Sequence, residues 1–101
     1  MSQEIEEVMS SYLREDQVTV VITLKVDTKE ADRIAGEITR FEPVEDLFLV
    51  TGDTDIIVKA RFRDYKELKE FLLKSLAPIS GIKDTKTLVV VMTYKERGVA
   101  Q

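Results

Sequence analysis

The sequence predicts a single α+β domain whose strands and helices follow one another in the order βαββαβ. Two observations carry this prediction. Segments with alternating apolar residues are separated by two helical patterns, and both helical patterns begin with the same Asp-x-Lys-Glu signal. The 101 residues, of which 44% are hydrophobic and 34% charged, have the size and composition of one folded domain.

The first half of the domain is expected to contain a strand, a helix and a second strand. The segment from Val18 to Val26 alternates between a wholly apolar face and a mixed face, as a half-buried strand does. Asp27 followed by Glu30 has the spacing of a capping box, and the helix that begins there is ended by Pro43. The second strand is expected from Val44 to Thr51.

The second half repeats this order. The tight turn Gly52-Asp53-Thr54-Asp55 leads into a third strand from Ile56 to Phe62. Asp64 followed by Glu67 repeats the capping signal and begins the second helical pattern. A final strand is expected from about Lys86 to Tyr94.

Two βαβ halves in one sheet predict the ferredoxin-like arrangement, in which a four-stranded antiparallel sheet carries both helices on one face. This domain is expected to span residues 18–95. Residues 1–17 have apolar side chains at helical spacing and are expected to form a short amphipathic helix. Residues 96–101 are expected to form a polar tail.

The second face of the sheet is expected to carry no helix. Apolar patches larger than a few hundred Å² are rare on monomers, so a second copy is expected to pack there and form a dimeric α/β sandwich. The alternative is that the N-terminal helix covers the patch. The apolar residues expected at the interface are Val21, Leu47, Leu49, Ile57, Val89 and Val91.

The composition excludes several classes of function. The chain has no Cys and no His, which rules out disulfides and thiolate nucleophiles and removes the usual base near neutral pH. A net charge of −4 without a basic stripe disfavours direct DNA binding. No metal site and no cofactor are expected. Because the acidic start lacks the features of a secretory signal and no apolar run is long enough to span a membrane, a cytoplasmic location is expected.

Three segments carry a resemblance to a known family. The first is Leu49-Val50-Thr51-Gly52-Asp53-Thr54-Asp55-Ile56-Ile57-Val58-Lys59, the second is Leu68-x-x-Phe71-Leu72, and the third reads Ile79-x-Gly81-Ile82-x-x-Thr85-x-Thr87-x-x-Val90. Together they resemble the C-terminal effector domain of the Lrp/AsnC transcription regulators, also called the regulation of amino acid metabolism (RAM) domain. The resemblance covers about Val18 to Lys95.

The resemblance implies a stand-alone effector module of the kind found mainly in archaea and bacteria, because 17 residues before the first strand are too few for the helix-turn-helix domain of the family. It implies homodimers that associate into higher oligomers such as octamers, with an amino acid bound between dimers. Such a module is expected to modulate transcription through full-length Lrp/AsnC-like regulators, without binding DNA itself.

The resemblance also implies a ligand site near the turn between the second and third strands and the start of the fourth. An amino acid needs an anionic acceptor for its ammonium group and hydroxyl or N–H donors for its carboxylate. Aspartates and threonines supply both, although the same residue types are common in ordinary turns and strands. The ligand-binding residues that the resemblance implies are Gly52, Asp53, Asp55, Gly81, Thr85 and Thr87.

Two other functions fit the residues. Dimeric ferredoxin-like sheets also support small oxygenases and isomerases, although the tyrosines, carboxylates and lysines of this chain form no recognisable acid/base motif. The other function is that of a structural adaptor, which caps larger regulators without any small ligand. An intersubunit pocket too small for an amino acid would favour the adaptor.

Overall fold

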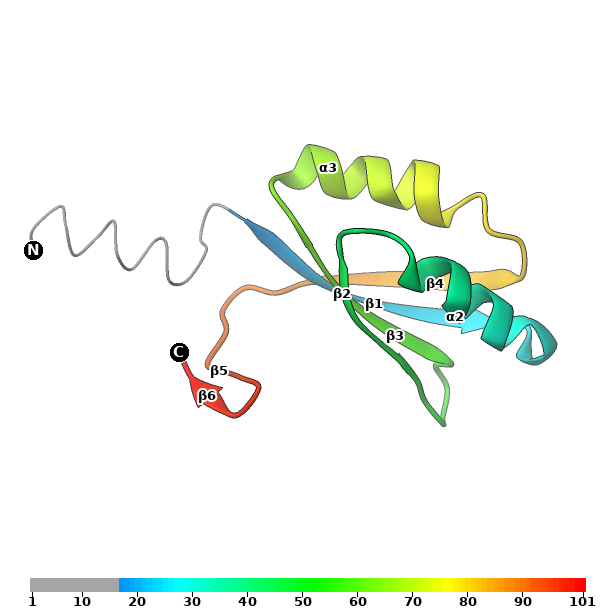
Figure 1. The fold of residues 1–101 in the computed structure, drawn as a ribbon, viewed down its shortest axis with the longest axis horizontal. Helices are drawn as coiled ribbons and strands as arrows, with labels where there is room; N and C mark the ends of the chain where they lie inside the picture. Colours follow the sequence, from blue (N-terminus) through cyan, green and yellow to red (C-terminus); the bar gives the residue numbers. More distant parts are fainter. Residues whose placement is uncertain (1–16) are drawn as a thin grey trace, which may run out of the picture.

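The computed structural model describes residues 17–101, and the amphipathic helix expected near the N terminus lies outside this range. Four strands form one antiparallel sheet in the order β2-β3-β1-β4, and two helices lie on one face of it (Figure 1). The predicted ferredoxin-like fold is therefore confirmed. The elements are β1 (Val18–Val26), α2 (Ala31–Thr39), β2 (Val44–Leu49), β3 (Ile56–Phe62), α3 (Tyr65–Glu70), β4 (Ile82–Val89), β5 (Lys95–Glu96) and β6 (Val99–Ala100).

The central strands β1 and β3 have the bounds that the sequence predicts. Their alternating sequences bury every second side chain beneath the helices, and the buried residues of one strand pair with those of the other, as Ile22 does with Val58. Full burial of an aliphatic side chain of this size stabilises a fold by about 1.5–3 kcal/mol. The alternation in these two strands therefore fixes which face of the sheet meets the helices.

Both predicted capping aspartates accept a backbone N–H, although Asp27 caps a 3-10 turn before α2 and not α2 itself. The carboxylate of Asp27 accepts a hydrogen bond from the N–H of Lys29 (3.1 Å) and caps a short 3-10 turn that leads into α2. The carboxylate of Asp64 accepts from the N–H of Glu67 (2.9 Å) at the start of α3. Beyond α3 the helix continues as a π-helical segment, Phe71–Leu76.

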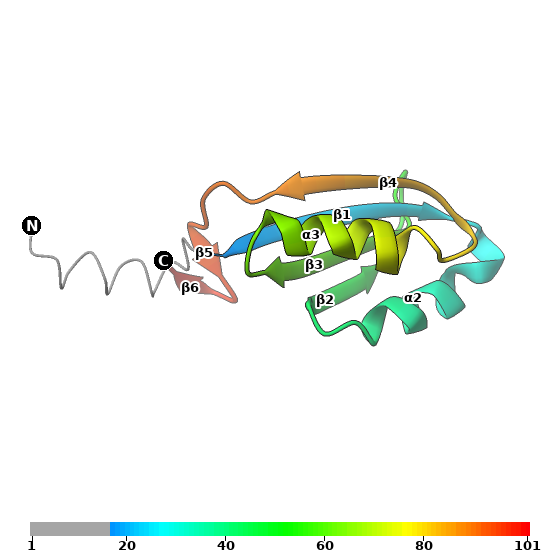
Figure 2. The same cartoon turned by 90° about the horizontal axis from the view of Figure 1, so that it is seen from above.

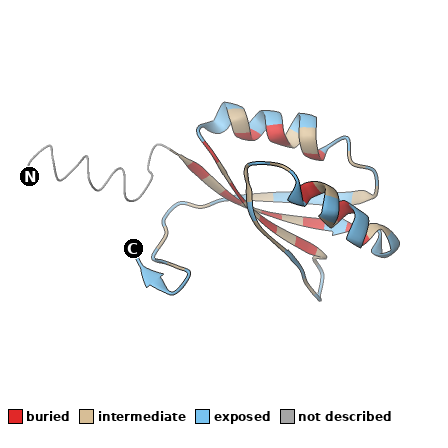
Figure 3. Cartoon of the chain, in the orientation of Figure 1, coloured by how far each residue is buried: buried red, intermediate tan, exposed pale blue. Residues whose placement is uncertain are grey.

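The core lies between the helices and the sheet, where the buried residues in Figure 3 gather. Phe71 joins the two layers, because its ring lies 5.1 Å from that of Phe62 on β3 and 5.6 Å from that of Phe41 after α2. Among the described residues, no side chain on the opposite face of the sheet is buried. Within residues 17–101 that face is therefore open.

The last strand of the sheet begins and ends earlier than predicted. β4 spans Ile82–Val89, whereas the strand was expected from about Lys86 to Tyr94. The physical reason is that β4 is an edge strand whose first half, Lys83 to Lys86, is polar and exposed, so apolar alternation does not mark its start.

The pairing between strands places three apolar residues on the helix side of the sheet, whereas the sequence predicted them on the opposite face. Leu47, Leu49 and Val89 each pair with a residue that is fully buried beneath the helices, so all three lie on the helix side of the sheet. In β2 the cause is a bulge between Val44 and Asp46, because one extra residue exchanges the two faces of a strand. The prediction that these three residues lie on the open face is wrong.

The open face has a different apolar composition. Val21 and Ile57 lie on it as predicted, while Val91 follows the end of β4 outside the sheet and is 94% exposed. Phe48 and Leu88, which were not predicted there, pair with Ile57 and Val21 on this face and are 58% and 51% exposed. The helix-free face, as it is called below, consists of Thr19, Val21, Thr23, Lys25, Asp46, Phe48, Ile57, Lys59, Arg61, Asp84, Lys86 and Leu88.

The C-terminal residues form a small hairpin that the sequence did not predict. Strands β5 and β6 pair across Arg97 and Gly98, both of which have positive φ, the backbone pattern of a two-residue type I′ turn. The hairpin lies on the opposite side of the sheet from α3 (Figure 1), at the end of the molecule where β1 begins (Figure 2).

Candidate functional site

The turn between β2 and β3 carries the first group of predicted site residues. The N–H of Val50 donates to the carbonyl of Asp55 (2.8 Å) and closes the turn. Gly52 within it has a φ of +113°, a conformation that L side chains rarely adopt. Gly52 and Asp53 are exposed, and Asp55 is half-buried.

Asp55 fastens this turn to the end of β1. Its Oδ2 atom accepts a hydrogen bond from the N–H of Val26 (2.9 Å), and its own N–H donates to the carbonyl of Leu24 (3.0 Å). The N–H of Val26 takes this side-chain partner because the ladder between β1 and β3 ends at the pair Leu24 and Ile56. One oxygen of Asp55 is therefore already used by the fold.

Gly81 fastens a second turn to the same place. The N–H of Asp27 donates to the carbonyl of Gly81 (3.0 Å), directly before β4 begins. Gly81 has a φ of +96°, and a Cβ atom there would lie 3.0 Å from Cδ1 of Ile34 on α2. The backbone conformation and the close approach of α2 both require glycine at this position.

Arg33 holds the second turn against α2. Its Nη2 atom donates to the carbonyl of Ser80 (2.8 Å), while Nε pairs with Glu30 (2.6 Å) and Nη1 with Glu37 (3.2 Å). The interactions with Glu30, the larger cause, and with Glu37 raise the pKa of Arg33 above its ordinary value. Sequence analysis missed this role, since the spacing of the two glutamates from Arg33 indicates only ordinary helix-surface pairs.

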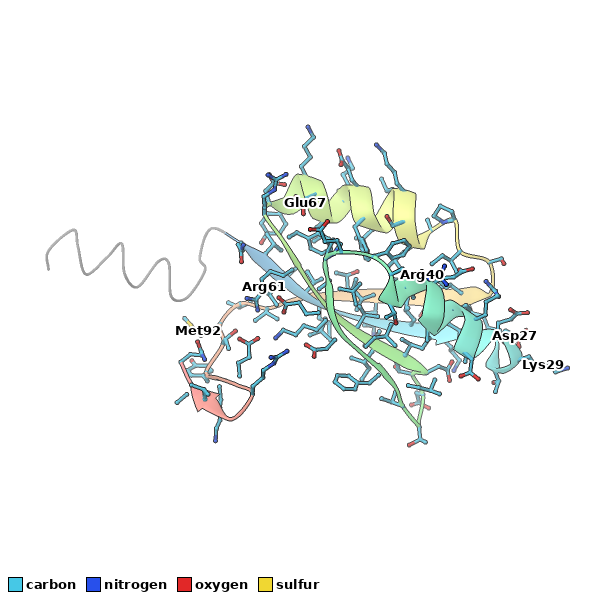
Figure 4. All side chains as sticks on the ribbon, in the orientation of Figure 1. Asp27, Lys29, Arg40, Arg61, Glu67 and Met92 are labelled. Carbon is cyan, nitrogen blue, oxygen red and sulfur yellow. The ribbon has the colours of Figure 1, made fainter. Side chains whose placement is uncertain are left out.

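The two predicted motifs thus meet at one end of the sheet. Val26 and Asp27 are neighbours in the chain, and their N–H groups bind the β2–β3 turn and the turn before β4, respectively. These two bonds hold both turns to the end of β1, one on each of its two sides. Figure 4 shows Asp27 and Lys29 at this end of the molecule.

The two threonines lie further along the sheet. Thr85 pairs with Leu24 and Thr87 with Ile22, on the helix side of β4; Thr85 is exposed and Thr87 half-buried. Because Leu24 also pairs with Ile56, β1 separates Thr85 from the β2–β3 turn by two strand spacings, roughly 10 Å. A single chain therefore spreads the predicted residues over a surface and does not close them around one small molecule.

Of the two aspartates in the β2–β3 turn, Asp53 is the one whose carboxylate has no partner among the described residues. In residues 17–101 its side chain has no hydrogen-bond or ion-pair partner, while its backbone carbonyl accepts from Nζ of Lys25 (3.3 Å). Chemically, this turn offers an exposed anionic acceptor beside backbone amides, while the hydroxyls of Thr85 and Thr87 lie on the other side of β1. The described residues contain no group of three acidic side chains placed to hold a metal ion.

A second cluster of charges lies on the helix-free face. Lys59 and Arg61 of β3 stand between Glu45 of β2 and Glu96 of the C-terminal hairpin. Glu96 pairs directly with Nζ of Lys59 and lies 3.2 Å from Nη2 of Arg61. These partners, Lys59 first, lower the pKa of Glu96 below its ordinary value. Figure 4 shows Arg61 on the sheet near the C-terminal segment.

Within residues 17–101, no helix has both the length and the apolar character needed to cross a membrane.

The fold and its two turns define a ferredoxin-like α+β domain. The family is shown by the sequence itself: a model described as the Lrp/AsnC ligand binding domain matches residues 19–100, so the chain belongs to the Lrp/AsnC family. This confirms the resemblance noted in the sequence. The family is one of transcriptional regulators and not of enzymes.

Individual relatives agree with this assignment. The HTH-type transcriptional regulator FL11 of Pyrococcus abyssi is 32% identical over 75 residues, which are 74% of this chain and 49% of that protein. The chain thus spans about half the length of the curated relatives it matches.

Solved structures of the family share the fold. E. coli AsnC has a TM-score of 0.74 at 22% identity, covering 79% of this chain and 54% of that one. A transcriptional regulator of Neisseria meningitidis in complex with L-Met has a TM-score of 0.73 at 23% identity, covering 83% and 56%. At these identities the likeness establishes the fold.

Proposed function

We propose that this chain is an amino-acid-binding regulatory domain that assembles with itself and acts on transcription through partner regulators in the cytoplasm. The observation that supports this best is the pair of backbone bonds from Val26 and Asp27, which bring both family motifs to one exposed end of the sheet. The complex of the Neisseria meningitidis regulator with L-Met indicates the class of ligand.

Asp53 is the proposed acceptor for the ammonium group of the ligand. Its carboxylate is exposed and unpartnered in the described chain, whereas Asp55 uses one oxygen to bind Val26. A charge-assisted hydrogen bond of this kind is about twice as strong as a neutral one. Asp55 and Gly81 therefore position the site, and Asp53 contacts the ligand.

The ligand carboxylate requires donors, which Thr85, Thr87 and the amides of the β2–β3 turn supply. Because β1 separates Thr85 from this turn in one chain, we place the closed site between subunits, where a second chain completes it. Ligand binding at such a site couples to assembly by mass action, since the assembled form binds the ligand and the single chain does not.

Assembly begins with a dimer in this account. The helix-free face presents Val21, Ile57, Phe48 and Leu88 on the side of the sheet that no helix of residues 17–101 covers. A two-fold axis would bury this patch against its own copy, and dimers would associate further into assemblies such as octamers. A net charge of −4 favours action on DNA through partner regulators over direct binding.

The proposal is tested by screening the proteinogenic amino acids one by one at millimolar concentration for a rise in melting temperature and a change in sedimentation coefficient. At a ligand concentration one hundred times Kd the expected stabilisation is about 2.7 kcal/mol. Loss of the response in Asp53→Asn, with the fold unchanged by circular dichroism, supports the assigned site. If no amino acid changes either quantity, the sensing part of the proposal is wrong.

A further inference from the structure

Lys25 is an exposed lysine at the end of β1, next to the β2–β3 turn. Its Nζ atom donates a hydrogen bond to the backbone carbonyl of Asp53 (3.3 Å), and within residues 17–101 it forms no ion pair. A lysine ammonium group has three donors, so two of them stay available after this bond. An unpaired cation therefore lies beside the residue whose carboxylate also has no partner in the described chain.

The backbone that carries both charges is held together by Asp55. The N–H of Asp55 donates to the carbonyl of Leu24 (3.0 Å), and its Oδ2 atom accepts from the N–H of Val26 (2.9 Å). Leu24 and Val26 are the residues on either side of Lys25. Since Asp53 precedes Asp55 by two positions in the same turn, the two free charges belong to one hydrogen-bonded unit of the fold.

The two charges lie close together without neutralising each other. No ion pair joins the side chains of Lys25 and Asp53 among the described residues. Asp84 on β4 is the register partner of Lys25, and it forms no ion pair with Lys25 either. A molecule with one positive and one negative group attached to neighbouring atoms would satisfy both side chains at once. An α-amino acid is such a molecule, because its ammonium and carboxylate groups are bonded to the same carbon.

We propose that Lys25 binds the carboxylate of the amino acid whose ammonium group Asp53 accepts, so that one chain supplies both charged partners of the ligand. The inference rests on the proposed amino acid binding and adds a charged residue to that site. Thr85 and Thr87 offer hydroxyl donors, which are uncharged. A carboxylate has about four acceptor positions, so it can bind a threonine hydroxyl and Lys25 together.

The pairing of Lys25 with a carboxylate makes the site selective for ligands that keep this group. A site that hydrogen-bonds a ligand group rejects an analogue without it, because the polar group of the protein is then left unpaired. Hydrogen bonds between charged groups are about twice as strong as neutral ones. Amino acid amides, which keep the ammonium group but have lost the negative charge, are therefore expected to bind poorly.

The experiment measures the affinities of L-methionine and L-methioninamide for the full chain by isothermal titration calorimetry. L-Met is the ligand in the complex of the Neisseria meningitidis regulator. If the amino acid screen identifies a different amino acid, that amino acid and its α-amide replace this pair of probes. The titrations are made at about pH 6, where the α-ammonium groups of both probes remain charged.

Two variants are compared with the unaltered chain. Lys25→Gln removes the charge and keeps an N–H donor for the carbonyl of Asp53. Lys86→Gln is the matched control, because Lys86 is an exposed lysine without a partner in the described chain. It lies on the same face of the sheet as Lys25 and pairs in register with Thr23, two residues before it. Both variants change the net charge by the same amount, and far-UV circular dichroism checks that each is folded.

We expect Lys25→Gln to weaken L-methionine binding at least about tenfold and L-methioninamide binding by less than about twofold. The unaltered chain should bind the amide at least about tenfold more weakly than the amino acid. Lys86→Gln should leave both affinities within about twofold. If Lys25→Gln leaves the amino acid affinity unchanged, or weakens both probes equally, Lys25 does not bind the carboxylate, although amino acid binding stands. If the unaltered chain binds no amino acid, the proposed function and this inference both fail.

Discussion

The carboxylate of Asp55 accepts a hydrogen bond from the backbone N–H of Val26 at 2.9 Å and thereby ties the β2–β3 turn to the end of the central strand. The next residue, Asp27, uses its N–H to hold the turn that contains Gly81. One strand end therefore positions both segments of the family motif. This relationship gives a structural reason for the aspartate that sequence analysis assigned to ligand binding.

Asp55→Ala is expected to destabilise the fold by about 1–3 kcal/mol, because the part-buried N–H of Val26 loses its acceptor. Asp53→Ala is the matched control, since the Asp53 carboxylate has no partner in the described chain, and it should change stability by less than about 0.5 kcal/mol. Urea denaturation monitored by circular dichroism measures both values. Equal destabilisation by the two substitutions would contradict the assigned roles.

Gly81→Ala is expected to destabilise the chain more than Gly52→Ala. Both glycines have positive φ, so each alanine adds backbone strain of about 1–2 kcal/mol. Only at Gly81 does the added Cβ also meet a neighbour, Cδ1 of Ile34 at 3.0 Å, whereas nothing lies within 4 Å at Gly52. The two midpoints of chemical denaturation decide the order, and a larger loss in Gly52→Ala would refute the packing argument.

Asp53→Asn is expected to weaken amino acid binding while leaving the melting temperature of the unliganded chain unchanged. The substitution keeps the size of the side chain but removes the charge that pairs with the ligand ammonium group, a loss of about 1.5–3 kcal/mol or roughly tenfold to a hundredfold in affinity. Isothermal titration calorimetry with the amino acid found by screening measures the change. Unaltered affinity would remove Asp53 from the site.

Phe48→Glu is expected to dissociate the dimer, because it places a charge in the apolar patch of the helix-free face. Leu73→Glu serves as its control: Leu73 is 60% exposed, close to the 58% of Phe48, and lies in the helical segment on the other side of the sheet. Size-exclusion chromatography with light scattering gives the mass of each variant. Retention of the dimer mass in Phe48→Glu would locate the interface elsewhere.

The ion pairs of Glu96 predict a pH dependence. Lys59 and Arg61 lower the pKa of this carboxyl below its ordinary value of 4.5, so its contribution to stability is fully present above pH 4.5. The contribution is lost as the pH falls through the lowered pKa and the carboxylate is protonated. The difference in melting temperature between the unaltered chain and Glu96→Gln should therefore be constant above pH 4.5 and shrink below it. A difference that grows on acidification would reverse the assigned sign.

The sequence predicted those parts of the fold whose signal is local and periodic. The bounds of β1 and β3 follow from strict alternation over Val18–Val26 and Ile56–Phe62, and both helix caps follow from a carboxylate at the right spacing. These patterns involve only residues close together in the chain, so they can be read without knowing the tertiary structure.

The predictions of strand faces and bounds failed at two places. One is the bulge in β2, where an extra residue exchanges the two faces of the strand, and the other is the edge strand β4. The bulge between Val44 and Asp46 moves Leu47 and Leu49 to the helix side and leaves Phe48 exposed on the other. No apolar alternation marks the start of β4, because its first residues face solvent. Short apolar runs do not reveal a bulge, so the composition of the helix-free face could not be read correctly from the sequence.

The candidate site was only partly predictable for a similar reason. The sequence grouped the glycines and aspartates of the turns together. It could not show that Asp55 binds the backbone of Val26 while Asp53 has no partner, because this hydrogen bond joins residues 29 positions apart. The hairpin that carries Glu96 gave no periodic signal, since β5 and β6 are two residues each. Arg97 and Gly98 at its turn were the available clue.

Native mass spectrometry of the purified chain tests the central claim most directly, because one spectrum reports both the number of subunits and the mass of any bound molecule. The account predicts an even-numbered assembly that gains the mass of one amino acid per site when the correct amino acid is present. A monomer that acquires no added mass with any amino acid at micromolar protein concentration would contradict it.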